Sequence, residues 1–419
     1  MSAVKHPLAL ACLSLAPMLA VAGDLTVRLT AATDYSSNPQ KLATAQSGRD
    51  DSVAVAVAFE DNLGGNQVSA AYSATQTASS GASNADGTRV AGRLNALIPV
   101  NSRLDVSVSH SAEQVLSDPT LASTTSNQRD THTLSVSADF RPFSPGRGDL
   151  LITPEMSYAA VTDGTGEDVR TTGLEVRYEY ALDPVTLIAP YARVTNTNPE
   201  LSERLEYRGG GVRVSRSLRE LSYFAELGRA RTDRASGAGT KDTEYSVGAS
   251  LDRAVYAVSV TADRSVQAAR PTSLVQQIAA QLGIQGIGVS QAVTRTLGTE
   301  LELRRLCERC SLTLRYDQVE QRFSAAPSND RDAVILGVSG SYELSRASVL
   351  RANWGAESTE FSSNPSSNFD TGNWGLAWDY RGIPGLSLTL TGGFETRDDV
   401  GTATDYDEWT FGASVTKTL

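Results

Sequence analysis

Residues 51–61, DSVAVAVAFED, alternate two kinds of side chain along the whole stretch. Large apolar side chains belong to Val53, Val55, Val57 and Phe59, and alanines fill the positions between them. A repeat of two is the spacing of a β-strand, in which successive side chains point to opposite faces. The stretch therefore predicts a strand with one face set against an apolar environment.

The same alternation recurs along most of the chain. Clear examples are residues 102–113, 130–142, 171–183 and 372–382. We count about twenty such stretches, most of about 10–14 residues, against the ~5–6 residues of a globular strand. A tilted strand that crosses a membrane needs ~9–11 residues. Tandem soluble sandwiches are the alternative, but their strands are seldom this long in every repeat.

The connections between these stretches also alternate, between a tight kind and a longer, polar kind. The tight connections are residues 62–66, 99–102, 182–185, 251–253, 307–310, 345–348 and 381–385. The longer ones are residues 37–49, 78–87, 116–129, 163–168, 233–241, 264–290, 324–331, 362–370 and 398–404. Short periplasmic turns and longer extracellular loops are typical of outer-membrane barrels. Soluble sandwiches have no reason to alternate loop length in this way.

We therefore expect an all-β fold, a transmembrane antiparallel β-barrel of about 20 strands with one short helix in a loop. Backbone groups inside a bilayer must all be paired, so the barrel must close on itself. Val, Leu, Ala, Tyr, Phe and Trp should face lipid, and Arg, Glu, Asp, Ser and Gly should face the lumen. Aromatic residues near strand ends should form two interfacial girdles; they are Tyr35, Phe59, Tyr158, Tyr191, Phe323, Phe361, Phe394 and Trp409.

The two ends of the chain predict an exported protein of the Gram-negative outer membrane. Residues 1–22 have a basic start, an apolar run and a small-residue cleavage site, which together predict a secretory signal peptide. Residues 23–419 would then form the barrel, surrounded by outer-membrane lipid. The last stretch, DYDEWTFGASVTKTL, resembles the C-terminal insertion signal of outer-membrane proteins, which implies the outer-membrane assembly machinery as a partner. Lys417 on its apolar face and the final Leu419 depart from that signal.

Charge and cysteine content narrow the function. The formal net charge is −11, which argues against a nucleic-acid partner. Cys307 and Cys310 flank a two-residue turn on the periplasmic side, where an oxidising compartment favours a structural disulfide between them. A redox site would need a helix N-terminus or a basic group beside the thiols. A zinc site would need a second pair of ligands.

We call the alternate strand positions that should face the interior the lumen phase, and those that should face lipid the apolar or outward phase. Charged residues in the lumen phase could fill the interior with ion pairs or line a hydrophilic pore, and the sequence leaves both open. These residues are Glu175, Arg177, Glu179, Glu302, Arg304, Arg315, Asp317, Arg351, Asp379 and Arg381. His110 and His132 lie in the apolar phase and are expected as interfacial polar residues; only a lumen-facing pair would suggest a metal site or a hydrolase. We expect no catalytic residue, no metal and no cofactor.

Two further segments interrupt the β pattern. In residues 264–290, the side chains of Leu274, Val275, Ile278, Ala279 and Leu282 share one side of a short amphipathic helix. This helix could fold inward as a gate or cap the barrel mouth. In residues 208–214, RGGGVRV, the apolar phase shifts between Tyr207 and Val212, which predicts a β-bulge.

Two segments carry a resemblance to a known group of proteins. The stretch from the helix through QAVTRTLGTELELRR (residues 291–305) to the CERC turn, and the entry strand LTVRLTAATDYSSNP (residues 25–39), are similar to outer-membrane barrels encoded with exopolysaccharide-export systems, including PEP-CTERM systems. The resemblance implies a role in polymer export, with polysaccharide-export components as partners. A pore for hydrophilic solutes or exopolysaccharide, a non-conducting structural or surface-interaction barrel, and a membrane hydrolase are the three hypotheses to compare.

Overall fold

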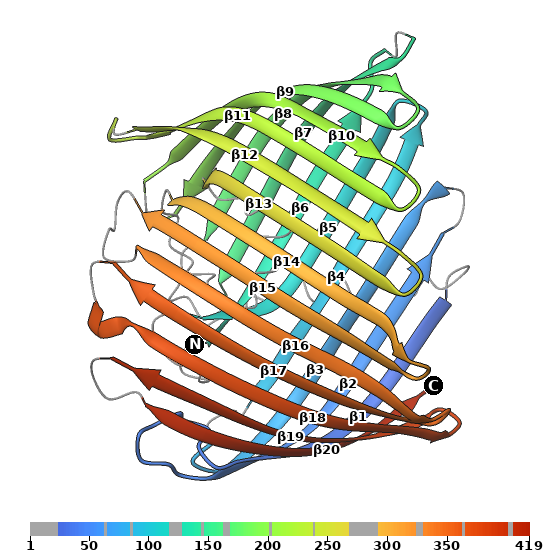
Figure 1. Cartoon of the computed structure of the whole chain (residues 1–419), viewed down its shortest axis with the longest axis vertical. Helices are drawn as coiled ribbons and strands as arrows, with labels where there is room; N and C mark the ends of the chain where they lie inside the picture. Colours follow the sequence, from blue (N-terminus) through green and yellow to red (C-terminus); the bar gives the residue numbers. More distant parts are fainter. Residues whose placement is uncertain are drawn as a thin grey trace, which may run out of the picture.

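The structure is a closed barrel of 20 antiparallel strands (Figure 1). It is a computed structural model that describes residues 24–62, 65–83, 87–116, 128–143, 146–161, 168–200, 203–237, 239–267, 292–323, 330–362, 365–400 and 405–419. The expected signal peptide, residues 1–22, lies outside the described residues. The predicted all-β barrel and its strand number are confirmed.

The strands are 12 to 16 residues long. The first ten are β1 (Asp24–Ser36), β2 (Gly48–Asp61), β3 (Gln67–Gly81), β4 (Gly87–Asn101), β5 (Leu104–Leu116), β6 (Gln128–Phe140), β7 (Gly148–Val161), β8 (Val169–Asp183), β9 (Thr186–Pro199) and β10 (Leu205–Ser217). The others are β11 (Leu221–Arg234), β12 (Gly239–Asp252), β13 (Tyr256–Gln267), β14 (Ala292–Cys307), β15 (Cys310–Phe323), β16 (Arg331–Ser345), β17 (Ser348–Phe361), β18 (Phe369–Ile383), β19 (Leu386–Asp399) and β20 (Tyr406–Thr418).

Each strand pairs with the next, and β1 pairs with β20 to close the ring. The closing ladder runs from Arg28 opposite Thr418 to Ser36 opposite Thr410. Closure leaves no strand edge to be satisfied by lipid, which is the condition for spanning a bilayer with β-structure. One 3-10 turn lies wholly within the described residues, η4 (Pro365–Ser367). None of the helices described here is long and apolar enough to cross a membrane.

The barrel has two unequal rims. Connections from even to odd strands are short, for example residues 184–185, 308–309 and 384–385, and we call their end the short-turn rim. Connections from odd to even strands are mostly longer and form the long-loop rim, on the left of Figure 1. Both β1 and β20 have their chain ends at the short-turn rim, where Leu419 N donates to Val27 O at 2.9 Å. The alternation read from the sequence is therefore present in the structure.

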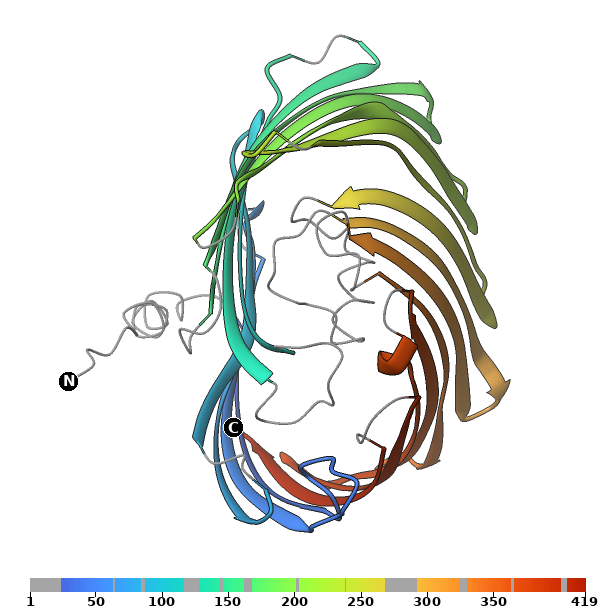
Figure 2. The same cartoon turned by 90° about the vertical axis from the view of Figure 1, so that its left-hand side faces the viewer.

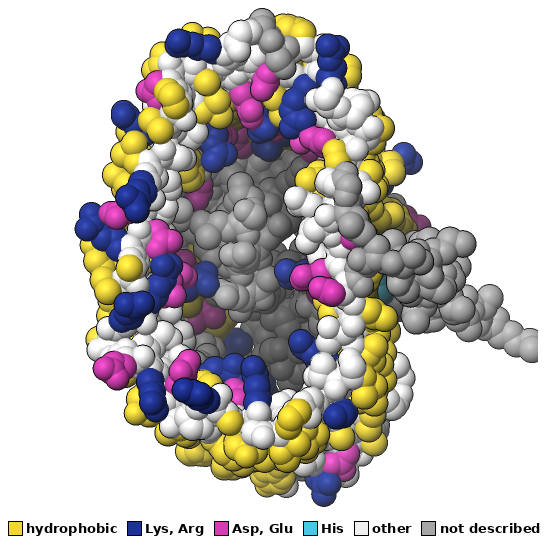
Figure 3. Space-filling model, turned by 90° about the vertical axis from the view of Figure 1, so that its right-hand side faces the viewer, with side chains coloured by type: hydrophobic (Ala, Val, Ile, Leu, Met, Phe, Trp, Pro, Cys, Tyr) yellow, Lys and Arg dark blue, Asp and Glu magenta, His cyan; other side chains and the backbone are white. Residues whose placement is uncertain are grey.

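The two faces of the wall follow the alternation in β2. Val53, Val55 and Val57 point outward and are exposed, whereas the alanines between them point inward. Large apolar side chains repeat outward around the ring, and charged side chains of both signs gather on the inner side (Figure 3). An apolar outer face around a polar interior is the arrangement of a membrane-spanning barrel.

Outward aromatic residues of the last three strands form a row on the long-loop side. Trp374, Phe394 and Trp409 lie opposite one another on β18, β19 and β20, with ring centroids 4.7 to 6.4 Å apart. Two of the expected girdle residues are corrected by the ladder register. Tyr191 pairs with Arg177 and Gly211, and Phe361 pairs with Arg331, so both side chains belong to the lumen phase.

The predicted bulge in β10 is wrong. Residues 205–217 pair with β11 without any register shift, and residues 205–216 pair with β9 equally regularly. The apolar phase changes because Tyr207 faces the lumen, while Val212 faces outward. A side chain on Gly209 would collide with the Tyr207 ring, and one on Gly211 would collide with the carbonyl oxygen of Leu227. The glycines therefore give space to an inward tyrosine and to a neighbouring strand.

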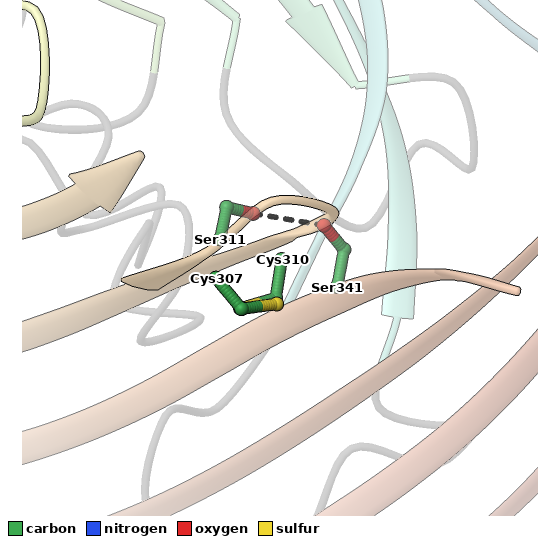
Figure 4. The surroundings of a disulfide bond; sticks show 4 residues. All are labelled: Cys307, Cys310, Ser311 and Ser341. Atoms are coloured by element: carbon green, nitrogen blue, oxygen red, sulfur yellow. Dashed lines mark hydrogen bonds between the residues drawn. A yellow bond between two sulfur atoms is a disulfide. The ribbon is translucent and has the colours of Figure 1, made fainter. Parts of the chain in front are cut away.

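The cysteine turn joins β14 and β15 at the short-turn rim (Figure 4). Cys307 and Cys310 are directly opposed in the ladder, with their Cα atoms 5.2 Å apart, and they form a disulfide. Beside the disulfide, the hydroxyl oxygens of Ser311 and Ser341 are 2.8 Å apart and share a hydrogen bond between β15 and β16. The predicted disulfide is present in the structure.

Candidate pore and its lining

An acidic stretch of the inner wall lies on β5 to β8. Arg177 Nη1 is 3.2 Å from Glu175 Oε1, and Arg177 Nε is 3.0 Å from Glu179 Oε1. Asp149 stands directly opposite Glu179 across the β7–β8 ladder. One guanidinium is therefore shared between two carboxylates, and a third carboxylate stands opposite one of them. Leu174 and Val176 of β8 point outward, so Glu175, Arg177 and Glu179 between and beyond them face the lumen. Asp149 of β7 faces the same side because it is the ladder partner of Glu179.

The wall from β12 to β19 carries more balanced ion pairs. Arg304 Nη1 donates to Asp252 at 2.6 Å, and Arg304 Nε donates to Glu302 at 3.0 Å. Arg315 pairs with Asp317 along β15, and Arg351 pairs with Asp379 across the β17–β18 ladder. Arg381 lies within a register irregularity near the end of β18, between Tyr380 and Ile383. The structure thus joins nine of the ten sequence-predicted lining residues into ion pairs and leaves Arg381 at the rim.

Carboxylates also face each other directly in several lumen-facing ladders. The opposed pairs are Asp24–Glu60, Asp34–Asp50, Asp105–Asp139, Asp149–Glu179 and Glu395–Glu408. The directly opposed arginine pairs of the described ladders, Arg208–Arg231 and Arg264–Arg295, belong to the outward phase. Like charges directly opposite one another weaken a sheet. These pairs therefore place negative charge on the inner wall at a cost to the sheet, which Lys41 offsets beside Glu395 and Glu408 and Arg141 offsets beside Asp105.

At the long-loop rim, residues 37–47 connect β1 and β2 and bring Lys41 to one of these acid pairs. Lys41 Nζ is 2.7 Å from Glu395 Oε1 and 3.7 Å from Glu408 Oε2, and it lies 5.2 Å from the centroid of the Tyr406 ring. Asn38, nearly fully buried, holds the loop with hydrogen bonds to the backbone of Leu42. The ammonium group of Lys41 thus lies between the opposed carboxylates of Glu395 and Glu408.

One sector of the inner wall is hollow because its side chains are small. A cavity of about 480 Å³ lies on β2 to β5, and its polar lining includes Glu60, Gln67, Ser69, Asn95 and Ser109. A second hollow of about 290 Å³ lies among Ala56, Ala58, Ala71 and Ser73 of the same sector. The hydroxyl, amide and methyl groups of this lining are short, which leaves the hollow open.

The end of β13 leaves the wall and bends into the barrel. The β12–β13 ladder stops at Tyr245 opposite Arg264, and no described residue of β13 stands opposite residues 239–244. Figure 2, viewed from the long-loop rim, shows the tip of β13 (yellow) pointing into the interior. Val266 packs with Leu205, Tyr207 and Ala230, which belong to the lumen face of β10 and β11.

Polar contacts fix this bent end to the inner wall. Arg264 Nη2 donates to Asp242 Oδ2 at 2.5 Å, and Val266 N donates to Glu244 Oε1 at 3.0 Å. The other carboxylate oxygen of Glu244 accepts from the Tyr207 hydroxyl at 2.6 Å. We call residues 264–266 of β13 and 293–296 of β14 the inward end, because β14 remains paired with β13 here.

The two histidines lie on the outer face. His110 pairs with Leu94 and His132 pairs with Ala112, both in the outward phase. Their rings stack at 5.7 Å, and the Tyr72 hydroxyl is 2.6 Å from His110 Nδ1. The hydrolase hypothesis required these rings to face the lumen, so the geometry removes its candidate base. In the described part of the chain, no group of three or more His, Cys, Asp or Glu side chains is arranged to hold a metal ion.

Sequence reasoning missed the contacts that depend on a bend or a loop. The segment expected as a connection, residues 264–290, begins with four residues of β13, which ends at Gln267. The helix residues Leu274, Val275, Ile278, Ala279 and Leu282 lie outside the described residues. Tyr207 could have been found from the sequence, because it precedes Gly209 by two positions, and a glycine in a strand often marks a close approach.

Comparison with known proteins supports the fold alone. No protein-family model matches the chain, and no curated protein matches it either. The FrpB iron transporter from Neisseria meningitidis (F5-1 variant, apoprotein form) superposes with a TM-score of 0.52 at 10% identity, over 94% of this chain and 81% of that one. The F5-1 variant gives 0.50 at 10% identity, over 94% and 82%. A BenF-like porin from Pseudomonas fluorescens Pf-5 gives 0.43 at 12% identity, over 94% and 99%.

Proposed function

We propose that this chain is an outer-membrane pore that passes small hydrophilic solutes and favours cations. The observation that carries the proposal is the inner wall, where five pairs of carboxylates oppose one another in four ladders. The two opposed arginine pairs of the described ladders share the outward phase instead. Rings of Asp and Glu make a pore favour cations, because they raise the local concentration of positive ions. The pore performs no catalysis in this proposal.

The outer face and the rims support the location. An apolar band with an aromatic row on its long-loop side suits a hydrocarbon layer and its interface with water. Short turns at one rim and longer loops at the other support an orientation with the short-turn rim in the periplasm of a Gram-negative cell. Closure of the ring through β1 and β20 makes the wall continuous.

Two other functions are less well supported by the lining. The resemblance to exopolysaccharide-export barrels implies polymer export, and this stays a prediction; an anionic glycan would be repelled by the acidic wall. A non-conducting barrel is favoured by one observation. The loop bearing Lys41 and the inward end both occupy space at the long-loop rim, so they could close the lumen.

The experiment is a planar-bilayer recording of the protein in a KCl gradient. We expect discrete conductance steps and a zero-current potential of the sign that K⁺ selectivity gives. Asp149→Asn with Glu179→Gln should move this potential toward zero, because the pair is opposed in the lumen. Asp51→Asn, on the outward face, is the matched control and should leave it unchanged. Chloride selectivity would contradict the cation preference, and silent membranes would contradict the pore.

A further inference from the structure

The inward end of β13 and β14 sits beside an incomplete ladder. Residues 239–244 of β12 pair with β11 on one side but face no described residue of β13 on the other. The outward side chains of β12 are apolar from Tyr245 to Leu251 and polar at Lys241 and Thr243. The gap therefore lies beyond the apolar band, on the long-loop side, where unpaired backbone groups can be hydrated.

The alternation of β13 shows that the side of the strand that faces lipid along most of its length lies inside the barrel at its end. Arg264 and Val266 share the phase of Val258 and Val260, which faces lipid lower in the strand. At the inward end this same face lies against the lumen side of β10 to β12. Val266 is 3% exposed and packs with Leu205 and Tyr207 at 2% and 3%. Side chains at positions that face lipid lower in the strand therefore pack inside the barrel here.

A second position for this end follows from the register of β12 and would keep the pairing of β14 with both β13 and β15. Continuing the register from Tyr245 opposite Arg264 would place Glu244 opposite Ser265 and Thr243 opposite Val266. The β12–β13 ladder, which stops at Tyr245 among the described residues, would be extended by these pairs. The contacts of Glu244 with Val266 N and of Arg264 with Asp242 would be lost. Two alternative sets of bonds for one strand end make a two-state element.

We propose that the inward end is the gate of the pore, lying on the inner wall when it narrows the mouth and completing the β12–β13 ladder when it opens. The latch is the chain of contacts from Arg193 through the Tyr207 hydroxyl to Glu244 and Val266 N, with donor–acceptor distances of 3.0, 2.6 and 3.0 Å. The proposal rests on the pore function for its physiological meaning. The movement itself can be measured separately.

Competing crosslinks test the movement. In a Cys307→Ser, Cys310→Ser background, Val266→Cys is combined either with Ala230→Cys, its neighbour in the buried cluster, or with Thr243→Cys, its partner in the completed ladder. We expect both pairs to form disulfides on mild oxidation, each in a fraction of the molecules. Failure of the Thr243→Cys pair to crosslink, while the Ala230→Cys pair does, would overturn the proposal because the end would then be fixed inward.

Conductance tests the gating. The oxidised Ala230 pair should conduct less than its reduced form, and the oxidised Thr243 pair should conduct more. Tyr207→Phe removes the latch hydroxyl but keeps the ring, and it should raise the fraction of time in the larger conductance state several-fold. Tyr223→Phe, an outward tyrosine on β11, is the control and should not. Equal conductance in both locked forms would overturn the gate. If no form conducts, the unlocked protein included, the pore function fails while the crosslink yields still decide whether the end moves.

Discussion

At the scale of single residues, spacing predicted the side chains that follow strand alternation and missed those whose backbone departs from it. Glu175, Arg177 and Glu179 were placed on one inner face by spacing alone, and they lie together in an ion-pair group. Tyr207 was placed outward because tyrosine usually faces lipid, yet it is an inner residue beside three glycines. Its partner Glu244 is 37 residues away, and no local pattern predicts such a contact.

Gly211→Ala should destabilise the barrel by about 1–3 kcal/mol, because the added methyl group meets the backbone carbonyl of Leu227 rather than a flexible side chain. Urea unfolding of the refolded protein, followed by tryptophan fluorescence, measures the change. Gly337→Ala is the matched control. Its methyl group would lie 3.6 Å from Arg315 Cβ, an ordinary contact, so its midpoint should stay close to the original or rise. A larger loss in the control than in Gly211→Ala would contradict the argument.

At the scale of strands and turns, the sequence was most informative, because the apolar phase repeats through nearly every strand. The sequence predicts the CERC segment as a tight turn between two strands, and it joins β14 to β15 at the short-turn rim. The bend at the end of β13 was not predicted, because Arg264 and Val266 keep the regular alternation while the backbone changes direction. Periodicity shows which side chains share one face of a strand. It does not show whether that face contacts lipid, the lumen or another part of the protein.

Replacing both Cys307 and Cys310 by serine should lower the free energy of unfolding by no more than about 2 kcal/mol. The disulfide closes a turn of only two intervening residues, so it removes little freedom from the unfolded chain. Urea midpoints of the double variant and of the original protein, each with and without reductant, give the comparison. Reductant should affect only the original protein. A loss well above 2 kcal/mol would mean that the bond organises more than its own turn.

Val176→Arg should cost about 2–4 kcal/mol, because it places a charge on the outward face near the middle of β8. The neighbouring position Glu175 faces the lumen, so Glu175→Gln should change ion selectivity with little effect on stability. Folding yield into lipid vesicles and the urea midpoint report the first effect. Equal stability losses at the two positions would argue against the assignment of faces.

At the scale of the whole molecule, the distribution of charge matters more than any one ion pair. The chain carries a net charge of −11, and several of its carboxylates oppose one another on neighbouring strands of the inner wall. Sequence composition gave the sign of this charge but not its concentration on the inner wall. That concentration depends on the register of all the ladders together, including the closing one between β1 and β20.

Cation preference should weaken as salt rises. The screening length falls from ~10 Å at 0.1 M to ~3 Å at 1 M salt, so carboxylates on the wall then act over less of the lumen. Zero-current potentials at a fixed concentration ratio but two mean concentrations measure the permeability ratio of K⁺ to Cl⁻. We expect the ratio to approach one at the higher concentration. A ratio that does not depend on salt would point to selection at a narrow site rather than by the field of the wall.

Closure through β1 and β20 has a consequence for chain connectivity. Thr30 and Thr416, separated by 386 residues, share a hydrogen bond of 2.8 Å, and Leu419 reaches Val27 at the same rim. The hydrogen bonds of the closed barrel therefore do not depend on which turn holds the two ends of the covalent chain. Joining the two ends with a short linker and opening the turn at residues 346–347 would give a circular permutant with the same ladders. The position of the cut decides which two strands become the ends of the chain and therefore pair last to close the barrel during assembly.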